Sequence, residues 1–326
     1  MPPPDRQPEK PLMGDQRDQS FAVTGGREFV IQPKGPFSWS AALDVLAGFP
    51  PLQHHSSSSS ERVRLTFPLD REFTPVAVVL RDDSGTLRGE VVGTENIEAV
   101  AAQVARIFSL DYDGSDYPAV GERDPEIGRL MQVFPGLRPL CFTSPYETAA
   151  WGIISQRINM RQAARIQDRL IQEHGHRLIV AGEDVTCFPT PDRLLDLESF
   201  PSLSAEKVER LRAVAQAALE GVLDAERLRA LGNDGAIQEL RAIRGIGPFW
   251  AATIYLRGCG IVDVFPDEPQ AIEALGHVQG LSQTPDIDEV QRLTEAYRPF
   301  RMWVCFLLRV AAGRGLIDST GGHGRP

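Results

Sequence analysis

The sequence predicts an α+β fold, in which a domain of strands and helices precedes an all-helical domain. Three observations support this prediction. Strand-like segments are found up to about residue 112, capped amphipathic segments follow up to about residue 318, and a length of 326 residues suits about two domains. We therefore expect an α+β domain at residues 21–112 and an all-helical domain at residues 113–318.

The first domain follows a Pro-rich, charged segment. Residues 1–20 have few large apolar groups and are predicted to be disordered, and residues 319–326 are predicted to be a flexible tail. "EFVIQP" and "RVRLTF" indicate strands, and "VAVVLRDDSGTLRGEVVG" indicates a hairpin that turns at "DDSG". "FSWSAALDVLAGFPP" and "NIEAVAAQVARIFSL" indicate helices, whereas "QHHSSSSS", with His54 and His55, indicates a loop.

Helix starts in the second domain are marked by capping residues. Ser144 begins S-P-Y-E, a capping box with Pro at the first helical position. Asn159, Thr190 and Ser204 mark further starts, and Gly221 ends the helix that follows Ser204. The last long helix, around "FRMWVCFLLRVAAG", has the composition of a buried segment. No strand signal is evident after residue 113.

Composition limits the kind of site this chain carries. The net charge of −10 argues against an indiscriminate polyanion binder, so a nucleic-acid site would be a local basic face. The four cysteines are far apart with no C-x-x-C pair, which argues against a zinc or iron–sulfur site and fits a reducing cytosol. Neither a membrane-length apolar run nor a secretory h-region is present, so we expect a cytoplasmic protein.

The segment "LRAIRGIGPFWAATIYLRG" predicts a helix, a tight turn and a second helix. Gly245 and Gly247 flank Ile246, which we expect to insert into the core; glycines allow positive φ and close approach of a ligand. The second helix would point its free N–H groups and positive dipole end at a phosphate. Three arginines and no acid lie between Leu240 and Val262: Arg241, Arg244 and Arg257. We interpret the segment as a phosphate-binding hairpin rather than a corner with solvated arginines.

This hairpin, followed by "DVFPDE", resembles the helix-hairpin-helix DNA glycosylases, specifically the bacterial 3-methyladenine DNA glycosylase II group. "PYETAAWGIISQRINMRQAARI", "CFPTPDRLLDL", "RLRAVAQAALEG" and "YRPFRMWVCFLLR" also resemble segments of that group, as does "FVIQPKGPFSWSAALDVL". The likeness covers roughly residues 28–315. It implies an N-terminal antiparallel sheet with packed helices, then a helix-hairpin-helix glycosylase domain. It also implies an enzyme that flips alkylated purines of the 3-methyladenine and 7-methylguanine type out of DNA and excises them by hydrolysis.

Such an enzyme needs a carboxylate near the oxocarbenium-like sugar. If the alignment has no gap after Gly247, the family's aspartate falls on Pro269, which cannot serve. A shift of one residue offers Glu268, with Asp267 beside it, and Pro269 at the first helical position would make Glu268 the cap. We favour Glu268 as the functional carboxylate. The alternatives are Asp267, or that both acids only cap the helix; Asp263 is expected to be structural.

The resemblance also assigns the base pocket. Phe249 stands where the family's lyases have a lysine that attacks the sugar, and a phenyl ring cannot form a Schiff base, so the enzyme is expected to be monofunctional. Phe249 and Trp250 are candidate pocket walls, although packing between helices is favoured for Trp250. Arg309 falls where the group offers a tryptophan to the base, which implies a more polar pocket. The predicted phosphate contacts are Arg244, Gly245, Gly247 and Arg301.

Gln156 and Arg157 match the positions that fill the gap left by a flipped base. A member of the family uses a leucine there as the wedge, whereas Arg157 would stack on the orphaned partner or hydrogen-bond to it. Arg161, Arg165 and Arg169 recur every four residues on one helix face, where solvation is favoured over phosphate contact.

The partner implied by this resemblance is double-stranded DNA with damaged bases. No cofactor and no metal are expected to be required, although a monovalent cation is expected at the hairpin when DNA is bound. The resemblance implies a monomer without a protein partner, acting on the nucleoid. Two alternatives stay open: a DNA-binding or lesion-recognition protein without catalysis, which Pro269 favours, and a glycosylase for a different damaged base.

Overall fold

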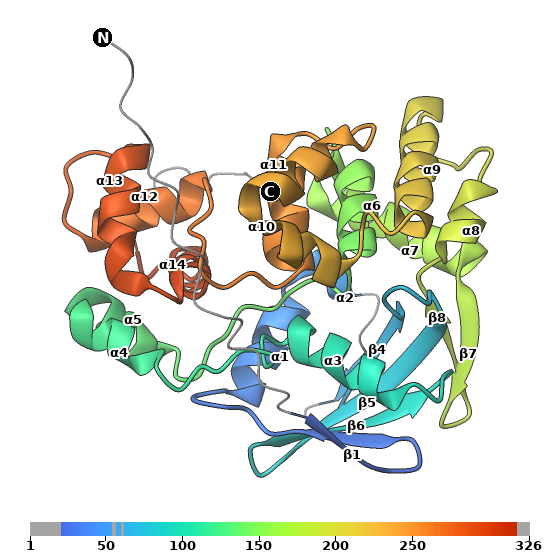
Figure 1. The fold of residues 1–326 in the computed structure, drawn as a ribbon, viewed down its shortest axis with the longest axis horizontal. Helices are drawn as coiled ribbons and strands as arrows, with labels where there is room; N and C mark the ends of the chain where they lie inside the picture. Colours follow the sequence, from blue (N-terminus) through green and yellow to red (C-terminus); the bar gives the residue numbers. More distant parts are fainter. Residues whose placement is uncertain (1–20, 54–56, 60–61, 318–326) are drawn as a thin grey trace.

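The computed structural model describes residues 21–53, 57–59 and 62–317. The predicted tails and the loop with His54 and His55 lie outside these residues. Over the described part, the α+β prediction is confirmed: an antiparallel sheet forms one end of the molecule and most helices lie beside it (Figure 1).

The N-terminal domain, in its described residues, is built on a six-stranded antiparallel sheet in the order β1-β2-β6-β5-β4-β3. The strands are β1 (Phe21–Gly25), β2 (Glu28–Ile31), β3 (Ser57–Ser59), β4 (Arg62–Pro68), β5 (Pro75–Asp83) and β6 (Thr86–Val92). The predicted hairpin turns at Ser84 and Gly85, both with positive φ. Apolar side chains of the sheet pack with those of α1 (Trp39–Ala47), α2 (Pro50–Gln53) and α3 (Ile97–Ile107) in one core.

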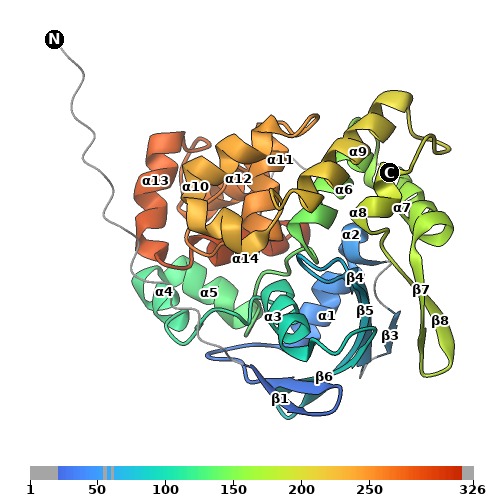
Figure 2. The same cartoon turned by 45° about the vertical axis from the view of Figure 1, so that its right-hand side comes forward.

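The remaining helices form two packed groups, each with its own core. The first comprises α6 (Pro145–Ser155), α7 (Met160–His174), α8 (Pro191–Leu195), α9 (Ala205–Leu219), α10 (Ala225–Ala242), α11 (Pro248–Thr253) and the π-helix η1 (Ile254–Gly258). The second comprises α4 (Pro118–Arg123), α5 (Pro125–Val133), α12 (Pro269–Val278), α13 (Ile287–Thr294), the 3-10 turn η2 (Glu295–Tyr297) and α14 (Arg301–Gly313). The two groups lie side by side in Figures 1 and 2.

The prediction that strands end before residue 113 is wrong. A hairpin of β7 (His176–Val180) and β8 (Glu183–Cys187) follows α7, turning at Ala181 and Gly182 with positive φ at both. It packs against the N-terminal sheet, where Thr66 Oγ1 donates to the Thr186 carbonyl at 3.0 Å and Val180 and Val185 contact Ala77. The turn was missed because alanine precedes its glycine where asparagine or aspartate is usual. The hairpin is stabilised by this tertiary contact.

The predicted helix starts are found where capping chemistry placed them. Ser144 Oγ accepts from the Glu147 amide at 3.0 Å, Asn159 Oδ1 from Gln162 at 2.9 Å, and Ser204 Oγ from Lys207 at 3.2 Å. Thr190 also precedes a helix, but its hydroxyl lies 2.9 Å from His176 Nε2. Capping residues therefore fix the frame on which the site is built.

Candidate active site

The turn between α10 and α11 has the predicted hairpin form. Gly245 has φ +92°, and a Cβ there would lie 2.6 Å from Cδ of Arg210, so both backbone and packing require glycine. Gly247 has φ −86° instead and caps α11, with open space where a Cβ would point. Only one of the two glycines therefore uses positive φ, which corrects the expectation for Gly247. Ile246 is buried in the core as predicted.

The three hairpin arginines differ in accessibility. Arg241 and Arg244 are exposed, and Arg244 pairs with exposed Glu209 at 2.8 Å. Arg257 is half-buried: it lies 4.6 Å from the ring centroid of Phe49 and donates to the Leu140 carbonyl. Burial lowers its pKa to about 10. The interpretation of Arg257 as part of a basic surface is wrong, because η1 turns this side chain toward the core.

The turn between α6 and α7 is tied directly to the hairpin. Gln156 Nε2 donates to the Gly245 carbonyl at 2.9 Å, and Gln156 Oε1 accepts from Arg210 Nη1 at 2.7 Å. Lys207 Nζ donates to the carbonyls of Ile154 and Gln156 at 2.7 and 2.8 Å. Burial, followed by the charge of Arg210, lowers the Lys207 pKa. Two side chains of α9 thus hold both turns as one unit.

Arg157 is the exposed tip of that turn. Its φ is +58°, a left-handed conformation that costs a non-glycine residue about 1–2 kcal/mol. The neighbouring bonds of Gln156 hold the backbone in this state and leave the Arg157 side chain outside. The structure therefore separates the two predicted wedge residues into an anchor, Gln156, and an outward-pointing Arg157.

Phe249 and Trp250 begin α11 but have different surroundings. The Phe249 side chain is 60% exposed, whereas Trp250 packs on α6 so closely that a Cβ on Gly152 would lie 2.8 Å from its Cδ2. Their rings meet edge to face, with centroids 5.4 Å apart. The prediction that Trp250 packs between helices is confirmed. Phe249 remains an accessible aromatic surface beside the hairpin.

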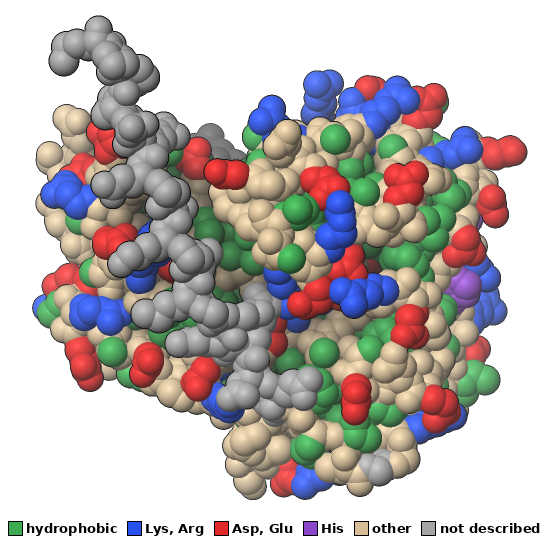
Figure 3. All heavy atoms as spheres, in the orientation of Figure 1, with side chains coloured by type: hydrophobic (Ala, Val, Ile, Leu, Met, Phe, Trp, Pro, Cys, Tyr) green, Lys and Arg blue, Asp and Glu red, His purple; other side chains and the backbone are tan. Residues whose placement is uncertain are grey.

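Basic side chains lie on the surface near the two turns and the start of α11. Figure 3 shows Lys and Arg side chains along the upper edge of the molecule, over α9 and α11, with some acidic side chains among them. Arg161, Arg165 and Arg169 continue along α7 as exposed residues, and Arg169 pairs with Glu173 at 2.5 Å. That pairing agrees with the solvated face that we favoured for these arginines.

Glu268 caps α12, as the position of Pro269 predicted. Its Oε2 accepts from the Ala271 amide at 2.7 Å, and its Oε1 lies 3.4 Å from Nη1 of Arg309 on α14. The Glu268 side chain is 17% exposed and that of Arg309 is 45% exposed. The structure thus brings together two predicted site residues that are 41 positions apart (309 − 268). It places them where the chain crosses from the first helical group to the second.

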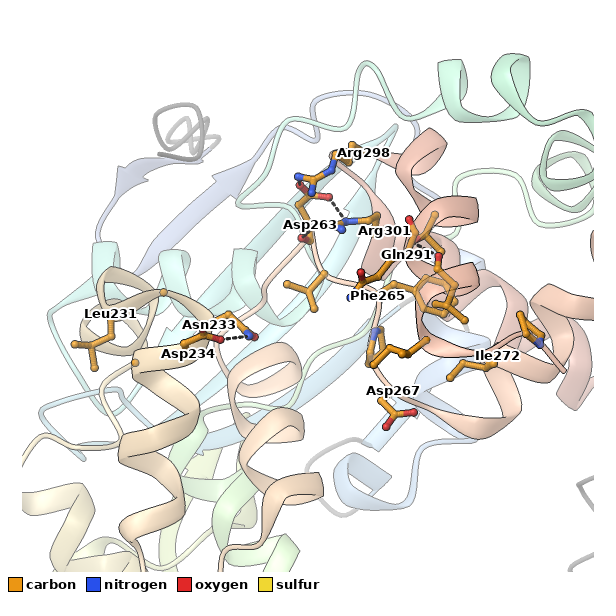
Figure 4. A pocket seen from close by; sticks show the side chains of 18 residues that line it. Leu231, Asn233, Asp234, Asp263, Phe265, Asp267, Ile272, Gln291, Arg298 and Arg301 are labelled. Carbon is orange, nitrogen blue, oxygen red and sulfur yellow. Dashed lines mark hydrogen bonds and ion pairs between the residues drawn. The ribbon is translucent and has the colours of Figure 1, made fainter. Parts of the chain in front are cut away.

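Asp267 lies in different surroundings. It is exposed and lines a pocket of about 1110 Å³ between α10 and the segment 263–267, whose lining does not include Glu268 (Figure 4). In the same pocket, Asp263 pairs with Arg298 at 3.0 Å and with Arg301 at 2.7 Å (Figure 4). Asp263 is therefore structural, as expected. The Arg301 guanidinium, predicted to contact phosphate, binds the carboxylate and carbonyl of Asp263.

Charges around Glu268 are dominated by arginines. Arg309 and Glu268 both influence the pKa of half-buried Arg257, which places all three groups in one electrostatic neighbourhood. Cys305 belongs to it as well: burial and then the charge of Glu268 raise the pKa of its thiol, which is therefore neutral at pH 7. The cluster thus brings two arginines, Arg257 and Arg309, close to one carboxylate, that of Glu268.

Sequence analysis missed Lys207, Arg210 and the site role of Arg257. The first two are on α9, far from the hairpin in sequence, and no local pattern marks them. Arg257 had a signal, since it lies within the apolar run "IYLRGCG". In the described ranges, we find no group of three His, Cys, Asp or Glu side chains that could hold a metal. No helix among the described residues is long and apolar enough to cross a membrane.

Comparison with other sequences gives two informative relatives. The chain is 24% identical over 220 residues to a Bacillus subtilis protein named DNA-3-methyladenine glycosylase, covering 65% of this chain and 71% of that protein. It is 29% identical over 212 residues to DNA-3-methyladenine glycosylase 2 of Escherichia coli, covering 64% and 71%. No family model matches the chain.

Comparison with solved structures agrees on the fold. A 3-methyladenine DNA-glycosylase from Archaeoglobus fulgidus superposes with a TM-score of 0.72 and 23% identity, covering 87% of this chain and 98% of that one. An 8-oxoguanine glycosylase/lyase from Clostridium acetobutylicum gives a TM-score of 0.62 and 17% identity, covering 87% and 94%. These structures share the arrangement of a sheet domain beside a helical domain.

Proposed function

We propose that this chain, which belongs to the helix-hairpin-helix DNA glycosylase superfamily, is a monofunctional DNA glycosylase that excises alkylated purines. The named relatives support the reaction class. The observation that carries the proposal is Glu268, a partly buried carboxylate at the start of α12. It lies one residue before the proline on which an ungapped alignment would place the family's aspartate.

DNA binds through the hairpin. The first amides of a helix lack intrahelical partners, so the amides after Gly247 can donate to a phosphate. The open space at the Gly247 Cα lets the backbone of DNA approach. Exposed Arg244 adds positive charge, exchanging Glu209 for a phosphate.

Arg157 fills the gap left by the flipped nucleotide. A wedge residue must keep its position when it replaces a base in the duplex. The hydrogen bonds of Gln156, Arg210 and Lys207 hold the backbone of this turn in place. Because the same bonds reach Gly245, binding of a phosphate at the hairpin sets the position of the wedge. Phosphate binding at the hairpin and flipping of the nucleotide are therefore coupled.

Hydrolysis then proceeds at the sugar. The bond between C1′ and the base nitrogen breaks, its electron pair stays with the base, and the sugar gains oxocarbenium character. The carboxylate of Glu268 stabilises that charge and accepts a proton from the water that adds to C1′. Phe249, which has no amine, leaves no route to a Schiff base, so the product is an abasic site.

The reaction needs no resident cofactor. A monovalent cation that joins when DNA binds would be held by main-chain carbonyls of the turn. Those of Ile243 and Gly245 each accept one hydrogen bond and keep a second lone pair. Such a cation would supply positive charge toward a phosphate. We further propose that the protein works as a monomer in the cytoplasm, on nucleoid DNA.

One observation favours a non-catalytic alternative: the Glu268 carboxylate already caps α12 and pairs with Arg309. Incubation with duplex DNA treated with a methylating agent separates the two functions. The enzyme releases free 3-methyladenine or 7-methylguanine, which chromatography detects. A lesion-recognition protein would bind the same DNA and release no base, and that result would contradict the proposed function.

A further inference from the structure

A long groove lies between α10 and α13. Figure 4 shows its larger part, a space of about 1110 Å³ with Leu231 on one side and Phe265 on the other. A second hollow of about 470 Å³ shares Asn233 and Asp234 with it and continues along α10 as far as Ala242. Along the helix, residues 233–242 span about 13 Å. Small-molecule sites measure about 300–1000 Å³, so the groove has the size and the elongated shape of a site for a chain segment.

Apolar side chains line this groove, and two large ones are exposed on its rim. Ile287, in the first turn of α13, is 66% exposed, and Leu231, beside the kink of α10, is 43% exposed. Both residues line the larger part, together with Phe265, Ile272 and Val290. Single exposed apolar residues are common on protein surfaces, whereas several that share one groove indicate an interaction site.

The charged side chains of the groove favour a basic partner. Arg298 and Arg301 line it, but both pair with Asp263, at 3.0 and 2.7 Å, and Arg298 also pairs with Glu295. Other acidic side chains in the groove or next to Ile287 are exposed, and no described lysine or arginine pairs with them: Asp234, Asp267, Asp286 and Asp288. Such side chains attract lysine and arginine and repel the phosphates of DNA.

We propose that this groove binds a segment of another protein, one in which apolar side chains are flanked by lysine or arginine. The apolar side chains fill the space between Leu231 and Ile287, and the basic ones pair with the acidic side chains of the rim. Residues 1–20 of this chain carry four acidic and three basic side chains, so they match the rim less well. Glu268 does not line the groove, so the partner binds apart from the proposed catalytic carboxylate.

Selection of peptides by the full-length protein tests this inference. Short random peptides displayed on phage are panned against the immobilised wild type, and a selected sequence is synthesised with a fluorescent label. We expect selected sequences to combine Leu, Ile, Met or Phe with Lys or Arg, and their affinity to fall as salt rises. Fluorescence polarisation should show that Ile287→Ser weakens binding by about tenfold or more, since an apolar contact is lost. The double variant Asp234→Asn/Asp288→Asn should weaken binding by about threefold at low salt.

Ile179→Ser is the matched control. Ile179 on β7 is 68% exposed, close to the value for Ile287, and it does not line the groove. This variant should bind the peptide as the wild type does, and thermal unfolding checks that each variant is folded. Base release from alkylated DNA should be unchanged in Ile287→Ser. A failure of the docking inference is therefore distinguishable from a failure of the proposed function.

Several results would overturn the inference. They are equal binding by Ile287→Ser and the wild type, the absence of any selected sequence, and selected sequences that are rich in acidic residues. A dimer in sedimentation velocity that Ile287→Ser dissociates would assign the groove to a second copy of this chain instead. Displacement of the bound peptide by alkylated duplex DNA would place the peptide on the DNA-binding face, which also contradicts the proposal.

Discussion

The hairpin and the Glu268 region lie on one continuous stretch of chain, yet they use different kinds of chemical group. At the hairpin, the working groups are main-chain amides and a glycine with φ +92°. Around Glu268, the working groups are side chains from η1, α12 and α14. Main-chain geometry is specified by a few adjacent residues, whereas a side-chain cluster depends on residues far apart. The resemblance predicts the same contrast, since it matches the family at the hairpin and implies departures at Glu268, Pro269 and Arg309.

The largest effect should follow from removing the charge of Glu268. Glu268→Gln keeps the size of the side chain and an oxygen that can cap α12, but it cannot stabilise an oxocarbenium ion. We expect base release to fall by about 10²-fold or more, with DNA affinity nearly unchanged. Single-turnover release and equilibrium binding on the same alkylated duplex measure the two quantities.

Asp267→Asn is the matched control for this change. Asp267 is exposed, lines the pocket in Figure 4 and has a different environment from Glu268, so its loss should have a smaller effect. If Glu268→Gln keeps full activity while Asp267→Asn abolishes it, the catalytic carboxylate is Asp267 and our assignment is wrong by one residue.

Gly247→Asp should produce the converse result, a loss of binding with little change in folding. No protein atom lies within 4 Å of a Cβ at this position, its φ suits any residue, and aspartate is a favoured N-cap. The new charge would repel the phosphate, so affinity for any duplex should fall by about tenfold or more.

Gly247→Ser keeps the cap without the charge and should bind DNA nearly as the wild type does. Thermal unfolding of both variants checks that the fold is intact. Wild-type affinity should also fall as salt rises, because counterions are released when phosphates are neutralised. An affinity that is independent of salt, or unaltered in Gly247→Asp, would rule out the hairpin as the phosphate site.

This contrast explains which features were predictable from the sequence. The helix starts at Ser144, Asn159 and Ser204 and the cap at Glu268 depend on neighbours within a few residues, so local chemistry predicts them. The pairing of Glu268 with Arg309 depends on how α12 and α14 pack, which no local pattern encodes.

The errors have the same origin. The β7–β8 hairpin is held by the N-terminal sheet, more than 100 residues earlier in the chain, as the bond from Thr66 to Thr186 shows. The outward position of Arg257 was inferred from charge alone, while its actual position depends on aromatic rings from three other segments. The anchoring of Gln156 by Arg210 likewise joins residues that are distant in sequence.

The smallest effect is expected at Arg157, which lies beside the hairpin and is proposed to assist flipping of the base. Arg157→Ala keeps a non-glycine residue at φ +58°, so the turn bears the same backbone strain and only the wedge is lost. Flipping a base from a matched pair costs a few kcal/mol of unstacking and unpairing, and a mismatched base costs less. Base release from a matched pair should therefore fall by about three- to tenfold, and release of the same base from a mismatch should change less.

Arg157→Gly, which also relieves the strain, tests whether the left-handed backbone conformation itself affects base release. Equal losses on matched and mismatched duplexes would show that Arg157 contributes only charge to binding. A selective loss on the matched duplex would support Arg157 as the residue that fills the gap left by the flipped base.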